Sequence, residues 1–198
     1  LLAESPWVLE AQTEEQRKER IATLFDLNNI RSHTSTALAR LRKLQGADGR
    51  WAWYKGMPGS SYVTEYIVEL NARLALLTGQ KPEGVAYTMQ YKAFESLHKD
   101  AVAAYELEKK EADEKQSAIS HRMLNYLYLI ALSGEKVPKR MSEAYNYYLA
   151  KVNAEQLASS SIQTKAMAIV ILCKAGRAAE AQPLVASVKE HLAKTDEE

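Results

Sequence analysis

The chain has 198 residues, which is long enough for one domain with a sizeable apolar core. Its 26 lysine and arginine residues nearly balance its 25 aspartate and glutamate residues, so the net charge is +1. This balance lacks the basic excess typical of nucleic-acid binding, and the single cysteine, Cys173, excludes an internal disulfide and a multi-cysteine metal site.

Helix-forming residues dominate and alternating strand patterns are absent, so the sequence predicts an all-α fold. The first expected helix follows Thr13, an N-cap residue whose three successors, Glu-Glu-Gln, suit a first helical turn. A second helix is expected over 34–44, where apolar residues recur at helical spacing.

Residues 45–60 form a long irregular segment that contains four of the eight glycines and two of the three tryptophans. Helical spacing resumes at Ser61. From there, one apolar stripe is expected to face inward, formed by Val63, Tyr66, Ile67, Leu70, Leu74 and Leu77.

Three later helices are expected to end at glycines, namely Gly79, Gly134 and Gly176. Between these glycines the sequence has room for four helices, predicted over 84–110, 116–132, 139–153 and 160–175. A final helix is expected to reach Lys194, with Pro183 in its first turns and four residues inward: Leu184, Val185, Val188 and Leu192. Cys173 lies in an apolar helical run and is expected to be buried.

The expected unit is a helical hairpin that ends in glycine, repeated at spacings of about 55 and 42 residues. Helices 116–132 and 160–175 are apolar on more than one side, which is typical of an inner, buried layer. We therefore expect about eight helices in an α/α toroid or an incomplete ring.

The chain begins with Leu1 and ends in the polar run 194–198, so we expect a single helical domain, residues 1–198, that is a piece of a longer protein. No apolar run approaches the roughly 18 residues that a membrane span requires. Any export signal is expected in the part that precedes this piece.

The irregular segment contains Gln45-Gly-Ala-Asp-Gly-Arg-Trp51 between two expected helices. This arrangement resembles the repeated Gln-x-x-Asp-Gly-x-Trp motif of terpenoid-cyclase-like α/α toroids. Asp-Gly favours a tight turn, a glutamine amide can bond backbone groups at a helix end, and tryptophan can seal a junction between layers. We expect a structural role for these four residues: Gln45, Asp48, Gly49 and Trp51.

The longer stretch 44–69 is similar to the region downstream of the thioester in bacterial alpha-2-macroglobulin proteins. It reads Leu-Gln-x-x-Asp-Gly-x-Trp-x-Trp-Tyr-x-Gly and continues through Ser60 and Thr64 to Tyr-Ile-Val-Glu. Two further pieces, 5–12 and 23–28, resemble members of this family from gut Bacteroidetes. The resemblance is strongest over residues 1–78, and Arg50 departs from relatives, which often have glycine there.

The resemblance implies a large, exported protein that traps proteases. A bait region is cleaved, the molecule rearranges, and a Cys–Gln thioester in the toroidal domain bonds the protease. The implied partners are neighbouring macroglobulin β-domains and target proteases. The implied location is the periplasm or cell surface, with a membrane-anchored parent, and no cofactor, metal or catalytic residue is expected in this chain.

The thioester motif of relatives, Cys-x-Glu-Gln, is absent from this sequence. Cys173 is followed by Lys-Ala-Gly and matches nothing in that motif. The thioester is therefore expected either before Leu1 or to have been lost, as in some relatives.

Two other interpretations remain open. A carbohydrate-active toroid enzyme could use the aromatic platform of Trp51, Trp53 and Tyr54 with Glu65 or Glu69 as a carboxylate. Among these residues, a possible interaction surface comprises Trp53, Tyr54, Glu65 and Glu69. Helix packing and a solvated helix face explain the same residues. The third interpretation is a plain helical scaffold.

The four histidines are scattered through the sequence, and none is spaced from another as metal ligands are. They include His121, at the start of an expected inner helix.

Overall fold

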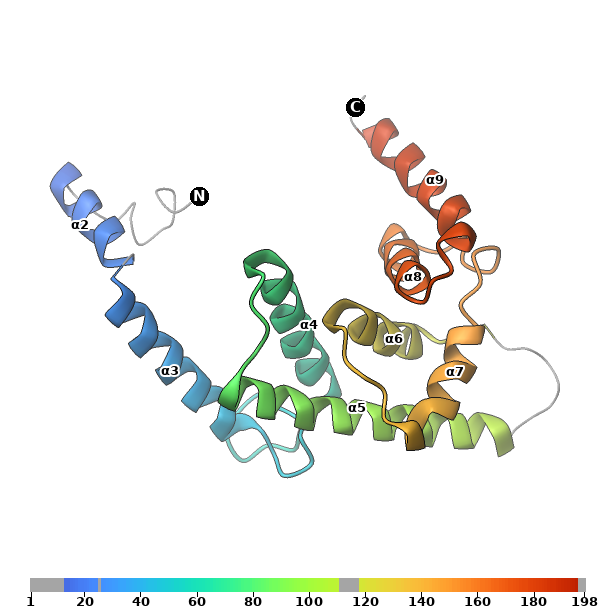
Figure 1. Ribbon diagram of the computed structural model, residues 1–198, viewed down its shortest axis with the longest axis horizontal. Coiled ribbons are helices and arrows are strands. Elements are labelled where there is room, and N and C mark those ends of the chain that lie inside the picture. The colour runs from blue at the N-terminus through green and yellow to red at the C-terminus, as the bar shows by residue number, and fades with distance from the viewer. Residues whose placement is uncertain (1–12, 25, 111–117, 196–198) are drawn as a thin grey trace. The chain divides into compact units, whose positions relative to one another are not determined.

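The computed structural model describes residues 13–24, 26–110 and 118–195 (Figure 1). These residues form eight α-helices and one short 3-10 helix without any strand, so the predicted all-α class is confirmed. The chain divides into two compact units, Leu1–Leu44 and Gln45–Glu198, which are described separately. The piece 5–12 of the family resemblance lies outside the described residues.

The first unit contains α2 (Glu14–Leu24) and α3 (Leu27–Leu44). Thr13 caps α2 as predicted: the Gln16 N–H donates to Thr13 Oγ1 at 3.1 Å, and the Thr13 N–H donates to Gln16 Oε1 at 3.3 Å. The start of α3 was predicted at residue 34, which is wrong. The helix begins earlier because the Asp26 carbonyl accepts the Ile30 N–H at 2.9 Å, and residues 31–36 are exposed, so they need no apolar pattern to be helical.

The second unit is a series of helical hairpins. Its elements in chain order are α4 (Ser61–Thr78), α5 (Gly84–Lys110), α6 (His121–Ser133), the 3-10 helix η1 (Lys139–Met141), α7 (Ser142–Ala150), α8 (Ile162–Lys174) and α9 (Ala178–Thr195). Most predicted ranges agree with these helices to within a few residues. Pro183 lies in the first turns of α9, as predicted.

The helix predicted over 139–153 is shorter than expected. It begins as η1 and ends at Ala150, and two turn carbonyls near this end accept hydrogen bonds from Arg177. The Arg177 guanidinium donates to Leu149 O at 2.9 Å and to Val152 O at 3.2 Å. These bonds replace the donors that a longer helix would have supplied.

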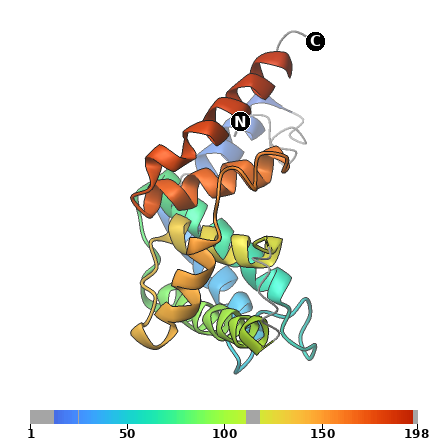
Figure 2. The same ribbon diagram turned by 90° about the vertical axis from the view of Figure 1, so that its right-hand side faces the viewer.

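Helix α6 is the centre of this unit (Figures 1 and 2). It packs against α4 on one side and α8 on the other, while α5 and α7 contact α6 and each other. The buried residues of α6 are Met123, Leu124, Tyr126, Leu127, Tyr128, Leu129 and Ile130. The prediction that this helix is buried on more than one side is therefore confirmed.

The three helices that pack side by side, α4, α6 and α8, share the same cap. In each, the serine before the helix accepts the backbone N–H three residues on, at 3.3 Å for Ser60, 3.3 Å for Ser120 and 3.2 Å for Ser161. At the other ends the predicted glycines take left-handed φ values of 70°, 67° and 76° at Gly79, Gly134 and Gly176. The repeat predicted from sequence therefore has a common local cause at both helix ends.

The predicted inward stripe of α4 is wrong. Its buried residues are Thr64, Val68 and Ala72. Of the predicted stripe, Val63 and Ile67 are half-buried, and the other four residues are exposed on the opposite side. The exposed fractions of that stripe rise to 59% at Leu74 and 86% at Leu77. Both sides of α4 are apolar, and the side with small residues is the one that lies against the rest of the unit.

Two single residues also differ from expectation. Cys173 is exposed, because α8 directs Met167, Ala168, Ile171 and Leu172 into its contacts with α6 and α9, and Cys173 lies outside that face. Leu192 is 55% exposed near the end of α9, whereas Leu184 in the same helix is 1% exposed.

His98, on α5, is a buried polar residue of the core. It is 2% exposed, and its Nδ1 lies 2.8 Å from the hydroxyl of Tyr126 on α6. Burial lowers the pKa of His98, an effect that nearby Glu95 opposes and Arg140 strengthens. His98 therefore connects α5 to α6 in its neutral form.

We expect His98 to make stability depend on pH below about 6.5, the ordinary pKa of histidine. Because the folded-state pKa is lowered, the unfolded chain takes up the proton first. The contribution of neutral His98 is thus complete above pH 6.5 and is lost as the pH falls through the lowered pKa. Urea unfolding of wild type and His98→Gln at several pH values measures this, and the difference between their free energies of unfolding should shrink in acid. A difference that stays constant would contradict the prediction.

Candidate functional site

The Gln45–Trp51 turn is built around one side-chain amide. Gln45 Nε2 donates to the carbonyl of Gly49 within the turn and to the carbonyl of Met89 on α5, both at 2.8 Å. The Gly46 N–H donates to Arg50 O at 2.8 Å, and Gln45 and Trp51 form an antiparallel bridge. The amide therefore closes the turn and attaches it to α5.

Asp48 and Gly49 shape the tip of this turn. The Asp48 carboxylate accepts the Arg50 N–H at 3.1 Å. Gly49 has a φ of +86°, and its Cα packs directly on the backbone of Lys92 in α5, so that a Cβ would overlap the Lys92 carbonyl. Only glycine fits this position.

Trp51 attaches the turn to α4. It is 1% exposed, and its backbone N–H donates to Thr64 Oγ1 at 2.9 Å. That hydroxyl donates to Ser60 O at 2.7 Å, and the Ser60 N–H returns to Trp51 O at 2.8 Å. Trp51 and the N-cap of α4 therefore form one hydrogen-bonded unit.

A cluster of paired charges lies beside the turn. Asp100 on α5 is bonded by Arg50 from the turn and by Arg122 from α6, the latter at 2.8 Å. Asp48 adds a longer ion pair to Arg50 at 3.9 Å. Asp100 thus connects three elements that are far apart in the sequence.

Glu65 lies close to this cluster on the side of α4 that faces α6. Asn125 Nδ2 donates to Glu65 Oε2 at 2.7 Å. Burial raises the pKa of Glu65, with Asp100 adding to the rise, while the bond from Asn125 and the charges of Arg122 and His121 lower it. Glu65 is therefore a half-buried carboxylate whose pKa lies above its ordinary value.

Glu69 has a different environment. Arg73 bonds its carboxylate with two nitrogens, at 2.9 and 2.7 Å, and also reaches the Tyr128 hydroxyl at 3.2 Å. Glu65 and Glu69 therefore do not form a pair of free carboxylates, because each is held by a partner of its own.

Two other predicted surface residues, Trp53 and Tyr54, are exposed by 56% and 72%. Trp53 stacks on Tyr62 of α4, with ring centroids 6.0 Å apart and an interplanar angle of 18°. From Tyr62 an exposed apolar strip continues along the helix through Tyr66, Leu70, Leu74 and Leu77. We call these five residues the outer face of α4.

Sequence reasoning missed the charge cluster. Arg50 was noted only as a departure from relatives, and Asp100 and Arg122 carried no motif. The three residues come from separate elements, so no local spacing could have indicated that they meet.

The described residues contain no group of three histidine, cysteine, aspartate or glutamate side chains that could hold a metal ion. His121 is exposed at the first position of α6. Among the described helices, none is both long and apolar enough to cross a membrane.

Replacing Gly49 by alanine should lower the free energy of unfolding by about 3 kcal/mol or more, because the methyl group would overlap the Lys92 backbone. Gly56 is a matched control: it has a φ of +89° and no atom within 4 Å of an added Cβ. Gly56→Ala should cost only about 1 kcal/mol, from the positive φ alone. Urea denaturation of both variants measures the difference, and equal losses would show that the contact with Lys92 is unimportant.

Comparison with models of protein families, with curated proteins and with solved structures gave no match to this chain. No related protein therefore helps to interpret the geometry of the turn and of α4. A function for the chain has to be argued from these features and from the resemblance of its sequence.

Proposed function

We propose that this chain is part of the helical, thioester-type domain of a bacterial alpha-2-macroglobulin-like protease trap. Its role there is structural and interactive, and it performs no catalysis itself. The sequence stretch that carries the resemblance, 44–69, supports this proposal, because its glutamine, glycine and tryptophan join α4 to α5 at one turn. The parent would be exported to the periplasm or cell surface.

The outer face of α4 is the observation that carries the proposal. An apolar face of a helix is normally buried against another element. In α4 the side formed by Thr64, Val68 and Ala72 is buried, while the outer face is between 47% and 86% exposed. Such a face is suited to a further layer of packing.

We assign this face to the remaining helices of an α/α ring in the parent chain. The second unit already packs α4, α6 and α8 side by side, and α4 is the end of that row. A further helix on the outer face would continue the row and bury its leucines, each worth about 1.5–3 kcal/mol. The completed ring would then dock against neighbouring macroglobulin β-domains and shield a thioester where one is present.

Leu74 tests this assignment. Leu74→Glu should change the stability of the 198-residue chain by no more than about 0.5 kcal/mol, because this leucine is 59% exposed. In the parent protein the same change should lower the stability of the helical domain by about 2 kcal/mol or more, because it would bury a charge. Thermal unfolding of both proteins measures the two effects.

Leu107 on α5 provides the matched control, since it is also 59% exposed but lies outside the outer face. Leu107→Glu should be neutral in both proteins. If Leu74→Glu were equally neutral in the parent, the assignment of the outer face to the ring would be wrong.

The trapping function itself requires the parent protein. Incubated with methylamine and weighed by mass spectrometry, a parent with a thioester should gain one methylamine and release one thiol. Incubated with an endopeptidase, it should be cleaved and then retain the protease in a complex. A folded parent that shows neither thiol release nor protease retention would contradict the proposal.

The stacked Trp53 and Tyr62 rings keep one alternative, a carbohydrate-active protein, open to experiment. Hydrolysis of a glycan by the chain, lost in Glu65→Gln, would favour that function. The Arg73 bonds to Glu69 argue for Glu65 as the carboxylate to test first.

A further inference from the structure

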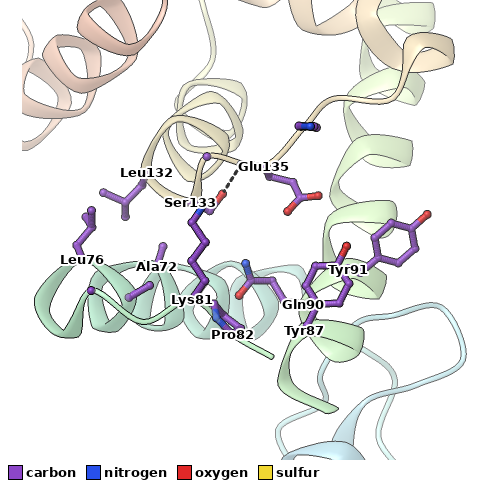
Figure 3. A pocket seen from close by; sticks show the side chains of 14 residues that line it. Ala72, Leu76, Lys81, Pro82, Tyr87, Gln90, Tyr91, Leu132, Ser133 and Glu135 are labelled. Carbon is purple, nitrogen blue, oxygen red and sulfur yellow. Dashed lines mark hydrogen bonds between the residues drawn. The ribbon is translucent and has the colours of Figure 1, made fainter. Parts of the chain in front are cut away.

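A pocket of about 590 Å³ lies where the C-terminal ends of α4 and α6 meet the first turns of α5 (Figure 3). Ala72, Leu76 and Leu132 form an apolar end of this pocket. Gln90 and Glu135 line its other end, as Figure 3 shows. The pocket is separate from the charge cluster around Asp100, which involves none of these residues.

Gln90 supplies the most specific feature. The residue is only 7% exposed, and its Oε1 atom is buried without a hydrogen-bond partner among the described residues. A buried acceptor without a donor is unfavourable, and native structures keep few of them without a reason. Because Gln90 also lines the pocket, a small rotation of its amide would let a ligand bound there supply the missing donor.

Glu135 adds a second acceptor. Its backbone N–H donates to Ser133 Oγ at 3.2 Å, the dashed line in Figure 3, which fixes the chain just after α6. Its half-buried carboxylate has no ion-pair partner among the described residues, and burial raises its pKa. A cation bound beside it would remove this unfavourable burial of charge.

The backbone contributes in the same direction. α4 and α6 both end at the pocket, at Gly79 and Gly134, and the last carbonyls of a helix carry partial negative charge. Lys81 and Lys136 also line the pocket, and both are exposed, so water screens their charge. Acceptors therefore line the pocket at the ends of both helices, at Gln90 and at Glu135.

We propose that this pocket binds the guanidinium group of an arginine side chain on an extended peptide. The planar group can donate to Gln90 Oε1 and to the Glu135 carboxylate together, which a single ammonium does less well. The aliphatic stem would lie on Leu76 and Leu132, and Tyr87 and Tyr91 at the rim offer ring faces for stacking. The pocket is larger than one arginine side chain and leaves room for adjacent backbone.

The test uses the 198-residue chain and acetylated, amidated alanine pentapeptides with a central arginine, citrulline or lysine. Binding is followed by NMR titration of the backbone amides. The arginine peptide should shift the signals of Gly79, Gly134 and Glu135. The citrulline peptide has the same shape without the charge and should bind at least tenfold more weakly. Equal affinity for arginine and citrulline would overturn the proposal.

Two variants address the acceptors. Glu135→Gln and Gln90→Leu should each weaken binding at least tenfold, whereas Glu106→Gln, the same charge change at an exposed position of α5, should not. Gln90→Leu should also unfold at an unchanged or higher temperature, because it removes an unpaired buried acceptor. If that variant lowered the unfolding temperature and bound arginine normally, Gln90 would be a structural residue and the proposal would fail.

Lys81 gives an independent check. With a peptide that is uncharged apart from its arginine, Lys81→Ala should strengthen binding several-fold, because it removes a positive charge from the lining of the pocket. Unchanged or weaker binding would mean that the pocket does not select a cation.

Free N-acetylarginine amide distinguishes an arginine within a peptide from a small free cation. An affinity equal to that of the peptide would show that the pocket binds a small cation and would overturn the peptide assignment.

Discussion

The Gln45 amide occupies the position on which the second unit depends. Its two donors are directed to two different elements, the Gly49 carbonyl in the turn and the Met89 carbonyl in α5. Within the same turn, Trp51 bonds Thr64 at the start of α4. One side chain and one short loop therefore fix how α4 and α5 lie relative to each other. Where the turn contacts α5, at position 49, only glycine fits. The same turn places Arg50 where its guanidinium forms an ion pair with Asp100.

The N-terminal and C-terminal ends of α4 and α6 differ in how the polar groups near them are satisfied. At the start of α4 and α6, Asp100 has two arginine partners and Glu65 has Asn125, so the polar groups there stabilise the packing. Near the C-terminal ends of the same helices, Gln90 Oε1 and the Glu135 carboxylate have no such partners within the part of the chain that the structure describes. Polar groups with partners stabilise the fold. Buried acceptors that lack donors indicate where a bound ligand could form favourable hydrogen bonds.

Much of the helical framework could be predicted because its signals are local. A capping residue or a left-handed glycine acts within one helical turn, so Thr13, Gly79 and Gly134 located helix ends correctly. Which side of α4 is buried could not be predicted from the sequence, because both sides are apolar. Tertiary packing alone determines that the side with Ala72 faces the rest of the unit. The start of α3 was missed for the opposite reason, since residues 31–36 of this helix are polar and exposed.

The candidate sites were predicted less well than the framework. The turn residues share one short segment, so their joint role could be inferred from a motif. Arg50, Asp100 and Arg122 meet only in three dimensions, and the acceptor of Gln90 is invisible until its burial is known. In sequence, Gln90 is one of many polar residues on a helix.

The outer face of α4 and the pocket make different demands on whatever covers them. The outer face needs only apolar area, which a helix of the same ring can provide through close packing. The pocket needs donors, because covering Gln90 Oε1 and Glu135 with apolar atoms would bury both acceptors further. Leu76 is 62% exposed and lines the pocket, so a helix that covers the outer face would approach the pocket without completing it. The two surfaces are therefore separable by mutation: a charge at Leu74 would lower the stability of the parent, whereas loss of the Gln90 acceptor would weaken binding without lowering stability.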